Sequence, residues 1–346
     1  MQAITYSKYG GPDVVQISEV PTPIIKDDQV LIKVHAASVS SGDWRARSLI
    51  LPKGFGLLGR LMFGIFGPRK PILGTELSGT IEAIGASVKK FKIGDAVVAF
   101  PDISMGAHAQ YCAMKEDGLI VKKPHNLNFA EAASLCFGGT TALSFLRDKC
   151  GIQPNEKVLI IGASGSTGSA AVQIAKSFDA EVTGICGPNN VALVQSIGAD
   201  HVIDYTKEDF TKNGETYDII LNCNGEIGFS DVEHSLAPRG RLGLILGNFK
   251  QLLGLERAPK KSGKKVIPGV AMTKLEDLEL LAKLAESGKY KPVIGHTFAF
   301  EAAQEAHAMV DTGHKRGNVV LIMQEHPSDN LNMAANNAGA NWHPFT

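Results

Sequence analysis

The stretch VLIIGASGSTGSAAVQIAK, residues 158–176, decides the fold class of this chain. Its first part is apolar, as is typical of a buried strand, and its alanine-rich second part has apolar residues at helical spacing. Glycines at positions 162, 165 and 168 lie between the two parts. A glycine turn that follows a strand and opens a helix is the setting in which dinucleotides are bound. Three glycines can also form a plain tight turn, so the surrounding elements must distinguish the two.

Strands and helices alternate after this turn. The apolar runs EVTGIC, HVIDY, YDIILN and RLGLIL have the length of strands, and helical segments separate most of them. This alternation predicts an α/β fold with a doubly wound parallel sheet, the Rossmann architecture. Residues 274–289 have the pattern of an amphipathic helix. Residues 128–150 also have helical spacing, which we expect Gly138 and Gly139 to interrupt.

The first ~125 residues have a different, β-rich pattern. Residues 29–39, QVLIKVHAASV, alternate like a strand entering a core, and residues 77–100 read as strand, turn, strand. We therefore expect two domains, a β-rich one made of residues 1–125 with 292–346, and a dinucleotide-binding one made of residues 126–291. The tail after Met323 is rich in Asn and Ala, and we expect it to be loosely ordered.

The composition disfavours several classes of protein. Lys plus Arg and Asp plus Glu are 35 each, so the neutral chain offers no broad electrostatic footprint for nucleic acid or an anionic membrane. We therefore expect no nucleic-acid or membrane partner. The five cysteines are scattered and form no CxxC pair, and the stretch MQAITYSKYG has no apolar signal core. Both features favour a reducing, cytoplasmic location.

One apolar stretch, residues 49–68, resembles a membrane span at first sight. It contains Pro52, Lys53, Arg60 and five glycines, whereas a span needs about 20 predominantly apolar residues with few charges. We expect a loop or short helix instead, packed over a pocket or a subunit contact. A homodimer is therefore among the assemblies that the sequence allows.

The glycine turn has a specific use in phosphate binding. Gly165 lets the backbone approach a pyrophosphate without a Cβ in the way, and Gly168 lets the helix lie close to the strand. The free N–H groups of the first helical turn and the helix dipole both favour phosphate charge. The hydroxyls of Ser164, Ser166 and Thr167 can add further donors.

The residues after the second strand bear on the choice between NADPH and NADH. An NAD site usually has Asp or Glu there, about 20 residues beyond the glycines, to bind the ribose 2′-hydroxyl. Here Cys186 is followed by GPNN, which contains no carboxylate. Gly187, Asn189 and Asn190 leave room for a 2′-phosphate, and Tyr205 can reach it. NADPH is favoured over NADH, although no Arg or Lys in this loop pairs with the phosphate.

Four segments carry a likeness to a known family. They are FGGTTAL, KVLIIGASGSTGSAAVQIAK, SIGADHVIDYTKEDF and GHKRGNVVL. With its β-rich start, residues 1–323 of the chain resemble the medium-chain dehydrogenase/reductase superfamily, and most of all its zinc-free quinone oxidoreductase branch, which includes zeta-crystallin. The branch usually has Gly-Gly-Val-Gly in the turn, where this chain has Gly165 to Gly168 as Gly-Ser-Thr-Gly. The resemblance implies that the β-rich domain is GroES-like.

Further cofactor contacts are expected at the ends of later strands. We place the ribose and nicotinamide near Asn222, Cys223, Leu246 and Gly247. The family resemblance adds two residues, Thr141 and Asn318, that approach the cofactor.

Zinc alcohol dehydrogenases of the superfamily take a catalytic ligand from a GVCxTD-like segment and another from GHE. The matching segments here are SVSSGD and GTE, so Ser40 replaces the cysteine and Thr75 the histidine. Neither hydroxyl is a credible zinc ligand, and the four-cysteine structural zinc lobe is missing too. We expect no zinc, and we interpret His35, His108 and Cys136 as ordinary core or surface residues.

Loss of the metal restricts the chemistry, because zinc is the Lewis acid that stabilises an alkoxide. Reducing a quinone or an α,β-unsaturated carbonyl is less demanding. Conjugation spreads the negative charge onto an oxygen that one or two hydrogen-bond donors, or water, can stabilise. The sequence therefore predicts a zinc-independent, NADPH-dependent reductase with small-molecule quinones, enones or enals as partners.

Ser40 and Arg45 are the candidate substrate-pocket residues, because they flank the vacant metal position. The pocket is expected between the two domains. Arg45 can donate to a developing enolate oxygen, or can instead form a surface salt bridge, for example with Asp43. No catalytic triad or carboxylate pair stands out, so the catalytic group is unknown. Two alternatives stay open: a non-catalytic, NADPH-binding crystallin-like protein, and a zinc-type alcohol dehydrogenase.

Overall fold

Two units make up the chain in the computed structural model, which describes residues 1–52, 54–225, 227–245, 247, 251 and 262–323. The β-rich unit comprises Met1–Arg47, Lys70–Ser134 and the chain from Ile294 onward, and the Rossmann unit comprises Ser48–Arg69 and Leu135–Val293. The domain limits expected from the sequence stay a prediction; this division differs from them chiefly in residues 48–69. Leu246 and the tail after Met323 lie outside the described residues.

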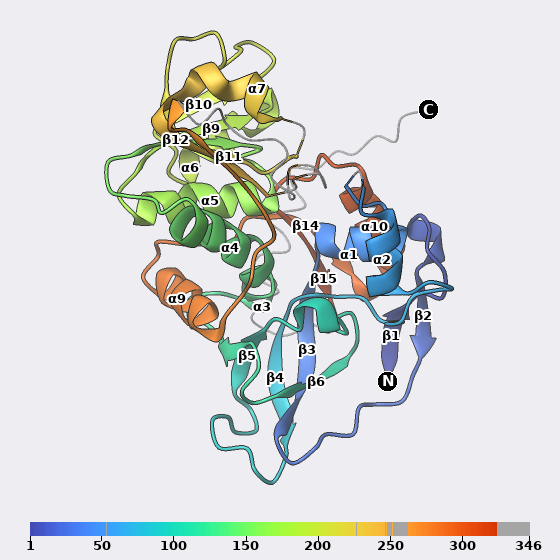
Figure 1. The fold of residues 1–346 in the computed structure, drawn as a ribbon. Helices are drawn as coiled ribbons and strands as arrows, with labels where there is room; N and C mark the ends of the chain where they lie inside the picture. The colour runs from blue at the N-terminus through green and yellow to red at the C-terminus, as the bar shows by residue number, and fades with distance from the viewer. Residues whose placement is uncertain (53, 226, 246, 248–250, 252–261, 324–346) are drawn as a thin grey trace. The chain divides into compact units, whose positions relative to one another are not determined.

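The Rossmann unit is built on a six-stranded sheet in the order β10-β9-β8-β11-β12-β13, and its strand pairings are parallel (Figure 1). The strands are β8 (Lys157–Ile161), β9 (Glu181–Cys186), β10 (His201–Asp204), β11 (Tyr217–Asn222), β12 (Leu236–Leu244) and β13 (Lys265–Pro268). Counted from β8, this order is 3-2-1-4-5-6, that of a doubly wound dinucleotide-binding sheet. The predicted fold class is confirmed, and the strand order reverses beside β8, where the glycine turn begins.

The helices of this unit follow the sequence pattern, with one correction. They are α2 (Gly56–Phe63), α4 (Cys136–Leu143), a π-helical turn (Ser144–Lys149), α5 (Ser166–Ser177), α6 (Val191–Ser196), α7 (Phe229–Val232) and α9 (Leu275–Glu286). The amphipathic helix expected over residues 274–289 is confirmed as α9. No helix in the described part of the chain is long and apolar enough to cross a membrane.

The expected interruption at Gly138 and Gly139 is wrong, because both glycines lie inside α4. A Cβ on Gly138 would lie 2.9 Å from the Ser166 carbonyl oxygen, and one on Gly139 would lie 2.9 Å from Leu281 Cδ1. Contacts this short are essentially never seen for real Cβ atoms. The two glycines therefore allow α4 to pack closely against α5 and α9, and this packing outweighs their low helix propensity.

The β-rich unit contains a two-stranded sheet, β1 with β2, and a larger sheet in the order β14-β15-β3-β4-β5-β7, with β6 also paired to β3. Its strands are β1 (Gln2–Thr5), β2 (Gln16–Glu19), β3 (Gln29–Val39), β4 (Leu77–Ile84), β5 (Ala96–Ala99), β6 (Tyr111–Lys115), β7 (Ile120–Lys122), β14 (Ile294–Ala299) and β15 (Asn318–Ile322); its helices include α1 (Ser41–Ser48), α3 (Phe129–Ala132) and α10 (Ala303–Asp311). Because β15 pairs with β3, two segments about 280 residues apart in the sequence lie side by side in the larger sheet.

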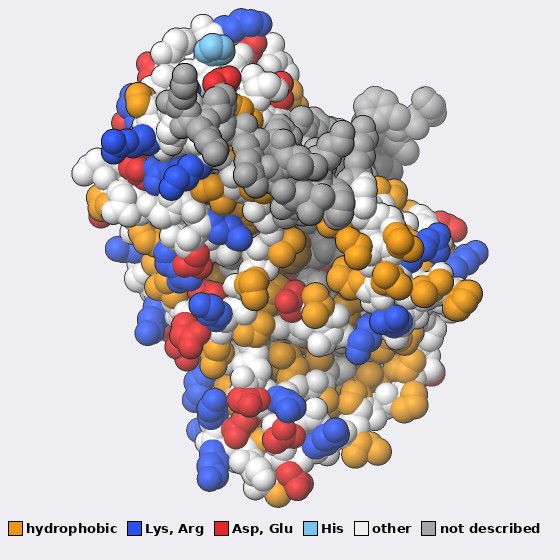
Figure 2. Space-filling view, viewed as in Figure 1, with side chains coloured by type: hydrophobic (Ala, Val, Ile, Leu, Met, Phe, Trp, Pro, Cys, Tyr) orange, Lys and Arg blue, Asp and Glu red, His pale blue; other side chains and the backbone are white. Residues whose placement is uncertain are grey.

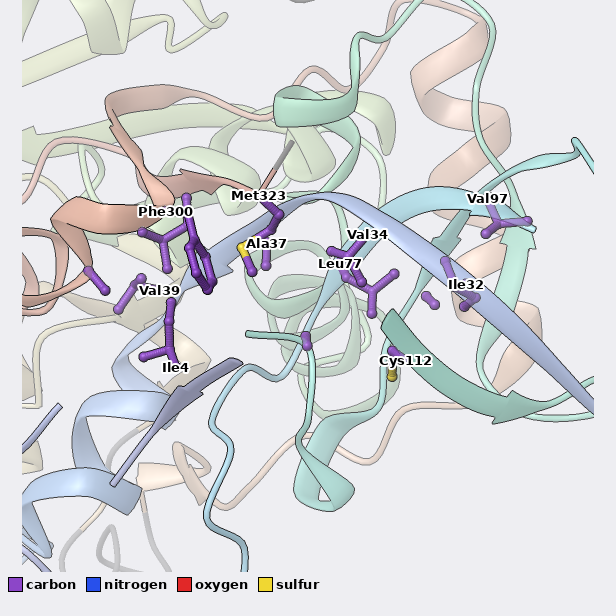
Figure 3. Packing of buried hydrophobic residues seen from close by; sticks show 14 of the residues in the cluster. Ile4, Ile32, Val34, Ala37, Val39, Leu77, Val97, Cys112, Phe300 and Met323 are labelled. Atoms are coloured by element: carbon purple, nitrogen blue, oxygen red, sulfur yellow. The ribbon is translucent and has the colours of Figure 1, made fainter. Parts of the chain in front are cut away.

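The core of the β-rich unit gathers around β3, whose residues cross the centre of Figure 3. Ile32, Val34 and Val39 of this strand are fully buried, and Leu77 of β4 and Phe300 pack in the same cluster. The predicted alternation of residues 29–39 is confirmed at the start of β3, while its second half is buried on both faces. Burial on both faces fixes the path of β3 into α1, where the candidate pocket residues lie.

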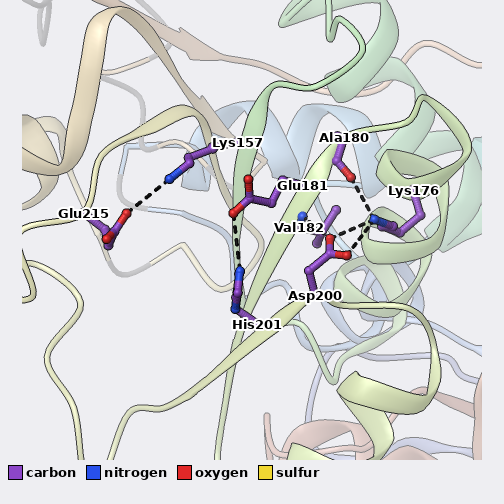
Figure 4. A network of polar contacts seen from close by, with 8 residues as sticks. All are labelled: Lys157, Lys176, Ala180, Glu181, Val182, Asp200, His201 and Glu215. Carbon is purple, nitrogen blue, oxygen red and sulfur yellow. Dashed lines mark hydrogen bonds and ion pairs between the residues drawn. The ribbon is translucent and has the colours of Figure 1, made fainter.

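Polar contacts hold β9 and β10 in register at one end of the Rossmann sheet (Figure 4). Asp200 accepts from Lys176 Nζ at 2.8 Å and from the Val182 amide at 2.7 Å. Two exposed contacts, Lys157 with Glu215 and His201 with Glu181, both have a distance of 3.3 Å. Surface pairs of this kind stabilise a fold only slightly. The Asp200 contacts matter more, because they join α5, β9 and the start of β10 and so position the ends of these strands.

Candidate active site

The glycine turn connects β8 to α5 with a defined geometry. Gly162 has a φ of +79°, in the left-handed region that favours glycine. Its amide and that of Ala163 donate to the Ile185 carbonyl of β9, at 3.2 and 2.9 Å. Gly165 then caps the N-terminus of α5. The turn is thus attached to two neighbouring strands at the edge of the sheet where parallel strands end.

Gly168 and Gly165 differ in what an added side chain would meet. A Cβ on Gly168 would lie 2.0 Å from the Gly162 carbonyl oxygen, so close packing of helix on strand requires this glycine. A Cβ on Gly165 would meet only that same oxygen, at an ordinary 3.5 Å. Packing within the chain therefore does not explain glycine at position 165. The turn has open space at this residue, and its glycines fit the predicted role of admitting a dinucleotide pyrophosphate close to the backbone.

The start of α5 provides hydrogen-bond donors to this space. The Ser169 amide donates to the Gly165 carbonyl at 2.9 Å. Ser169 makes the first hydrogen bond of the helix. The amides of Thr167 and Gly168, earlier in the chain, therefore have no acceptor within the helix. Ser164 and Thr167 are half-buried, and Ser166 is 8% exposed. Amides and hydroxyls at a helix N-terminus form an anion site, so these groups fit the predicted binding of phosphate.

The end of β11 lies beside the turn, and β12 pairs with β11 on its other side. Asn222 pairs with Ile161 of β8 and is fully buried; its side-chain oxygen accepts from the amides of Asn224 and Gly225. Burial raises the pKa of the Cys223 thiol to about 12, so this cysteine is neutral and is no nucleophile. A Cβ on Gly247 would be 3.1 Å from Pro268 Cβ, which explains a small residue there.

Gly187 and Tyr205 are neighbours at the ends of β9 and β10. A Cβ on Gly187 would lie 3.3 Å from the Tyr205 hydroxyl, and Tyr205 is 62% exposed. Asn190 is close in sequence and donates its amide to the Gly187 carbonyl at 3.0 Å. The sequence analysis missed a charge here. Asp204 pairs with Cys186, and hydrogen bonds from Thr206 hold the pKa of its carboxyl below the usual range, so it is ionised.

Two residues assigned by family resemblance fall in different units. Thr141 is in α4 of the Rossmann unit, three residues after Gly138, and its hydroxyl donates to the Phe137 carbonyl at 2.7 Å. Residues three apart share a helix face, so Thr141 is on the side where Gly138 touches the start of α5. Asn318 is buried at the start of β15 in the β-rich unit.

Ser40 and Thr75, at the positions of the missing metal ligands, belong to one buried polar cluster. Their hydroxyl oxygens are 3.2 Å apart. Ser40 also donates to Asp43 Oδ2 at 2.6 Å, while the other carboxylate oxygen of Asp43 accepts from the Gly74 amide at 2.8 Å. A serine hydroxyl has a single hydrogen, so Thr75 is the donor between the two hydroxyls.

The donor set of this cluster does not fit a zinc ion. It offers two hydroxyls and one carboxylate that backbone amides already bind, without thiolate or imidazole. Among the described residues, no three His, Cys, Asp or Glu side chains form a group that could hold a metal. His108 instead bonds the Ser38 carbonyl at 2.8 Å, and His35 lies 3.2 Å from the Thr80 hydroxyl.

Two cations belong to the β-rich unit near this cluster. Arg45 of α1 lies over the Trp44 ring, with 5.0 Å from its guanidinium carbon to the ring centroid. Lys315, which the sequence analysis did not single out, precedes β15. Val319 pairs with Val39, so the residues before β15 run beside those after β3. Burial lowers the pKa of Lys315 to about 8, although the carboxylates of Glu76 and Asp43 raise it. No local pattern marks Lys315, since its carboxylate neighbours are far away in sequence.

The fold and the turn together define a class: a two-unit nicotinamide-dependent oxidoreductase architecture. Residues 26–139 match the family model of the alcohol dehydrogenase GroES-like domain, and residues 197–321 match that of zinc-binding dehydrogenases. The chloroplast envelope quinone oxidoreductase homolog of Arabidopsis thaliana is 32% identical, over 93% of this chain and 98% of the relative. The chloroplastic NADPH-dependent alkenal/one oxidoreductase of the same plant is 30% identical, over 93% and 79%.

A similar solved structure is that of the quinone oxidoreductase from Coxiella burnetii, with a TM-score of 0.80 and 28% identity over 94% of this chain and 99% of that one. The chain therefore belongs to the medium-chain dehydrogenase/reductase superfamily, with quinone oxidoreductases among its relatives, as the sequence analysis predicted. The GroES-like assignment of the β-rich part is confirmed. The second family description names zinc, whereas this chain has hydroxyls at the two aligned ligand positions, so the absence of zinc stays a prediction.

Proposed function

We propose that this enzyme is a zinc-independent reductase that transfers hydride from NADPH to a quinone or an α,β-unsaturated carbonyl. Two features of the structure, taken together, support the proposal. A glycine turn opens α5 at the switch point of the sheet, and hydroxyls stand at both metal-ligand positions. The first provides for a nicotinamide cofactor, and the second excludes the Lewis acid that alcohol oxidation uses. Relatives named for quinone and alkenal/one reduction support this substrate class.

In this mechanism the bound cofactor supplies the hydride, and the chain positions the cofactor and stabilises charge. We assign pyrophosphate binding to Ser164, Gly165, Ser166, Thr167 and Gly168. Asn222, Cys223, Gly247, Thr141 and Asn318 are assigned to the rest of the dinucleotide. Leu246 stays in that proposed set as a residue outside the described part of the chain.

We assign charge stabilisation at the substrate oxygen to cations near the Ser40 cluster. The Ser40 hydroxyl donates to Asp43, so we propose that Ser40 shapes the pocket and does not donate to substrate. Arg45 and Lys315 are the two candidates for that donation. Lys315 can also deliver a proton, because its lowered pKa makes the ammonium a stronger acid.

NADPH is the proposed cofactor, with modest discrimination against NADH. Gly187 places no side chain beside the Tyr205 hydroxyl, and because Tyr205 is 62% exposed it can move to admit a 2′-phosphate there. Lys207 Nζ lies 3.6 Å from Asp204 and offsets part of that carboxylate's charge. Without an arginine in this loop the phosphate has few charged partners, so the preference is expected to be about tenfold to a hundredfold.

The deciding experiment is steady-state oxidation of NADPH and of NADH with a panel of quinones, enals and enones. Turnover of at least one of these classes, faster with NADPH, is the expected result. Tight NADPH binding without turnover of any acceptor would favour the crystallin-like alternative. Oxidation of simple alcohols that depends on added zinc would favour the alcohol dehydrogenase alternative.

We keep the cytoplasm as the proposed location and a homodimer as a proposed assembly. The feature that supports the location is the scattered set of free cysteines, four of which are buried. The names of both relatives given above place those proteins in the chloroplast. Fractionation of the source cells tests the location directly.

A further inference from the structure

Helix α2 and the loop after it hold large apolar side chains in solvent. Seven of them between residues 50 and 66 are exposed, and together we call them the apolar face: Ile50, Leu57, Leu58, Leu61, Met62, Ile65 and Phe66. Leu57 is 75% exposed, and Phe66 is fully exposed. Figure 2 shows hydrophobic side chains gathered where Figure 1 places α2, with basic side chains at their edge. Large patches of exposed apolar surface mark interaction sites.

The orientation of α2 is fixed by its own packing. Leu57 and Leu61, like Leu58 and Met62, are four residues apart, so the four share one side of the helix. Gly59 is buried on another side, where an added Cβ would lie 1.9 Å from Leu51 Cδ1. The helix is therefore held by its glycine side, and its apolar side faces solvent.

The loop after α2 is equally well defined. Gly64, with a φ of +132°, ends the helix, and a Cβ there would lie 1.9 Å from the Gly67 carbonyl oxygen. Arg60 Nη1 donates to the Ile65 carbonyl at 3.2 Å, and the Arg69 amide donates to the Phe63 carbonyl at 2.8 Å. These bonds close the loop on the helix end and hold Phe66 at its tip. The exposure of Phe66 is thus built into the backbone.

The segment that carries the apolar face has charges of one sign. Residues 44–75 contain no Asp or Glu and six basic residues, of which Arg47 is buried in an ion pair with Asp311 and Arg60, Arg69 and Lys70 are exposed. Leu and Phe side chains flanked by arginines on a short helix are the pattern of segments that lie in a membrane interface. The surface is complementary to anionic lipid headgroups.

We propose that the apolar face docks this enzyme on an anionic lipid membrane. Phe66 and the leucines of α2 enter the headgroup region, while Arg60 and Arg69 contact lipid phosphates. The sequence analysis expected no membrane partner, on overall charge and because residues 49–68 cannot span a bilayer; a segment that cannot span one can still lie on its surface. The proposal does not rest on the reductase function. If both hold, apolar acceptors dissolved in the bilayer are delivered beside the enzyme.

The test is co-sedimentation of the full chain with vesicles of phosphatidylcholine alone or mixed with phosphatidylglycerol. We expect binding to the mixed vesicles that weakens as salt rises. The double variant L61S/F66S removes two anchors and should lower the partition coefficient by at least about tenfold. The matched control is Ile24→Ser, which removes a side chain that is 95% exposed in the β-rich unit. All these side chains are exposed, so thermal melts should show folded protein.

The charge component has its own pair of variants. Arg69→Gln should weaken binding to the mixed vesicles and reduce its salt dependence, whereas Lys92→Gln, also exposed, should change neither. Absence of binding to the mixed vesicles overturns the proposal, as does equal binding by L61S/F66S and wild type. A wild-type dimer that L61S/F66S converts to monomer, without vesicle binding by either, would assign the face to a second copy of the chain.

Discussion

At the scale of single residues, the glycines at positions 165 and 168 have different roles. Gly168 is required by packing, because its added Cβ would lie 2.0 Å from a carbonyl oxygen, while Gly165 has room for one. The difference separates a glycine that packing requires from one that packing leaves free, and to the second we assign phosphate binding. A sequence pattern of three glycines contains no such distinction, since it depends on where the strand and helix meet.

Gly165→Val should therefore fold and lose dinucleotide binding. The backbone at this residue is extended, with φ −78° and ψ 177°, so valine fits the chain and its branches fill the proposed phosphate space. Cofactor affinity, measured by calorimetry, should fall at least about a hundredfold while the melting temperature changes little. Gly168→Ala is the contrasting variant and should lower the melting temperature. Unchanged affinity in folded Gly165→Val would show that the turn does not bind the phosphates.

Gly187→Asp should reverse the choice of cofactor. The backbone there, φ −78° and ψ 164°, accepts any side chain, and the exposed Tyr205 can move to make room. A carboxylate would accept from a ribose 2′-hydroxyl and repel a 2′-phosphate. The ratio of kcat/KM for NADPH to that for NADH should fall about tenfold to a hundredfold. Gly187→Asn, of equal bulk without charge, should shift the ratio less. If neither variant changes the ratio, the 2′ group binds elsewhere.

Lys315 should give the reaction a pH dependence. If its ammonium stabilises the substrate oxygen, kcat/KM should decline as pH rises through about 8, the lowered pKa of this group. Lys315→Met should be slower and lack that decline, and Lys315→Arg should move it to higher pH. A wild-type decline that persists unchanged in Lys315→Met would contradict the assignment.

Burial of the Lys315 ammonium also affects the stability of the folded chain. Because the unfolded state binds more protons between about pH 8 and 10.5, stability should rise over that range.

At the scale of elements, the contact of α4 with α5 supports the start of α5, to which we assign the cofactor phosphates. Gly138 meets Ser166, the first residue of α5, so a change in α4 should reach the amides proposed to bind them. Local propensity disfavours two glycines in a helix, and the sequence analysis accordingly expected a break there. Close helix packing decided otherwise.

Gly138→Ala tests that contact. The added methyl would lie 2.9 Å from a backbone oxygen and must displace the start of α5. We expect a loss of about 1–3 kcal/mol in the free energy of unfolding, by denaturant titration, together with weaker NADPH binding. Gly56→Ala in α2, where an added Cβ meets nothing within 4 Å, should instead stabilise the chain slightly. Equal effects of the two substitutions would argue against tight packing at Gly138.

At the scale of the whole molecule, the absence of thiolate and imidazole at Ser40 and Thr75 has a direct consequence. Purified protein should contain no stoichiometric zinc by elemental analysis, and a chelator should leave its reductase activity intact. The control is a zinc alcohol dehydrogenase treated in parallel, which should lose activity. One tightly bound zinc per chain whose removal abolishes activity would overturn the assignment of a metal-free branch.

The sequence by itself determined the doubly wound sheet, the glycine turn and the hydroxyl residues at two positions that hold zinc ligands in related enzymes. These features lie in local patterns: strand and helix periodicity, a short motif with its flanking elements, and residue types at aligned positions. The cofactor choice followed only in part, because the Asp204 charge beside Cys186 depends on which strands pair. The sequence also did not indicate Lys315, because its carboxylate neighbours come from segments far away in the chain.

Only the tertiary structure decided how glycines 138 and 139 are used and where residues 49–68 place their side chains. In both cases the deciding quantity is a contact between segments far apart in sequence or the lack of one, and periodicity carries no information about it. Helix α4 keeps its glycines because α5 and α9 lie against them. Helix α2 keeps its leucines in solvent because its glycine side is the one that packs.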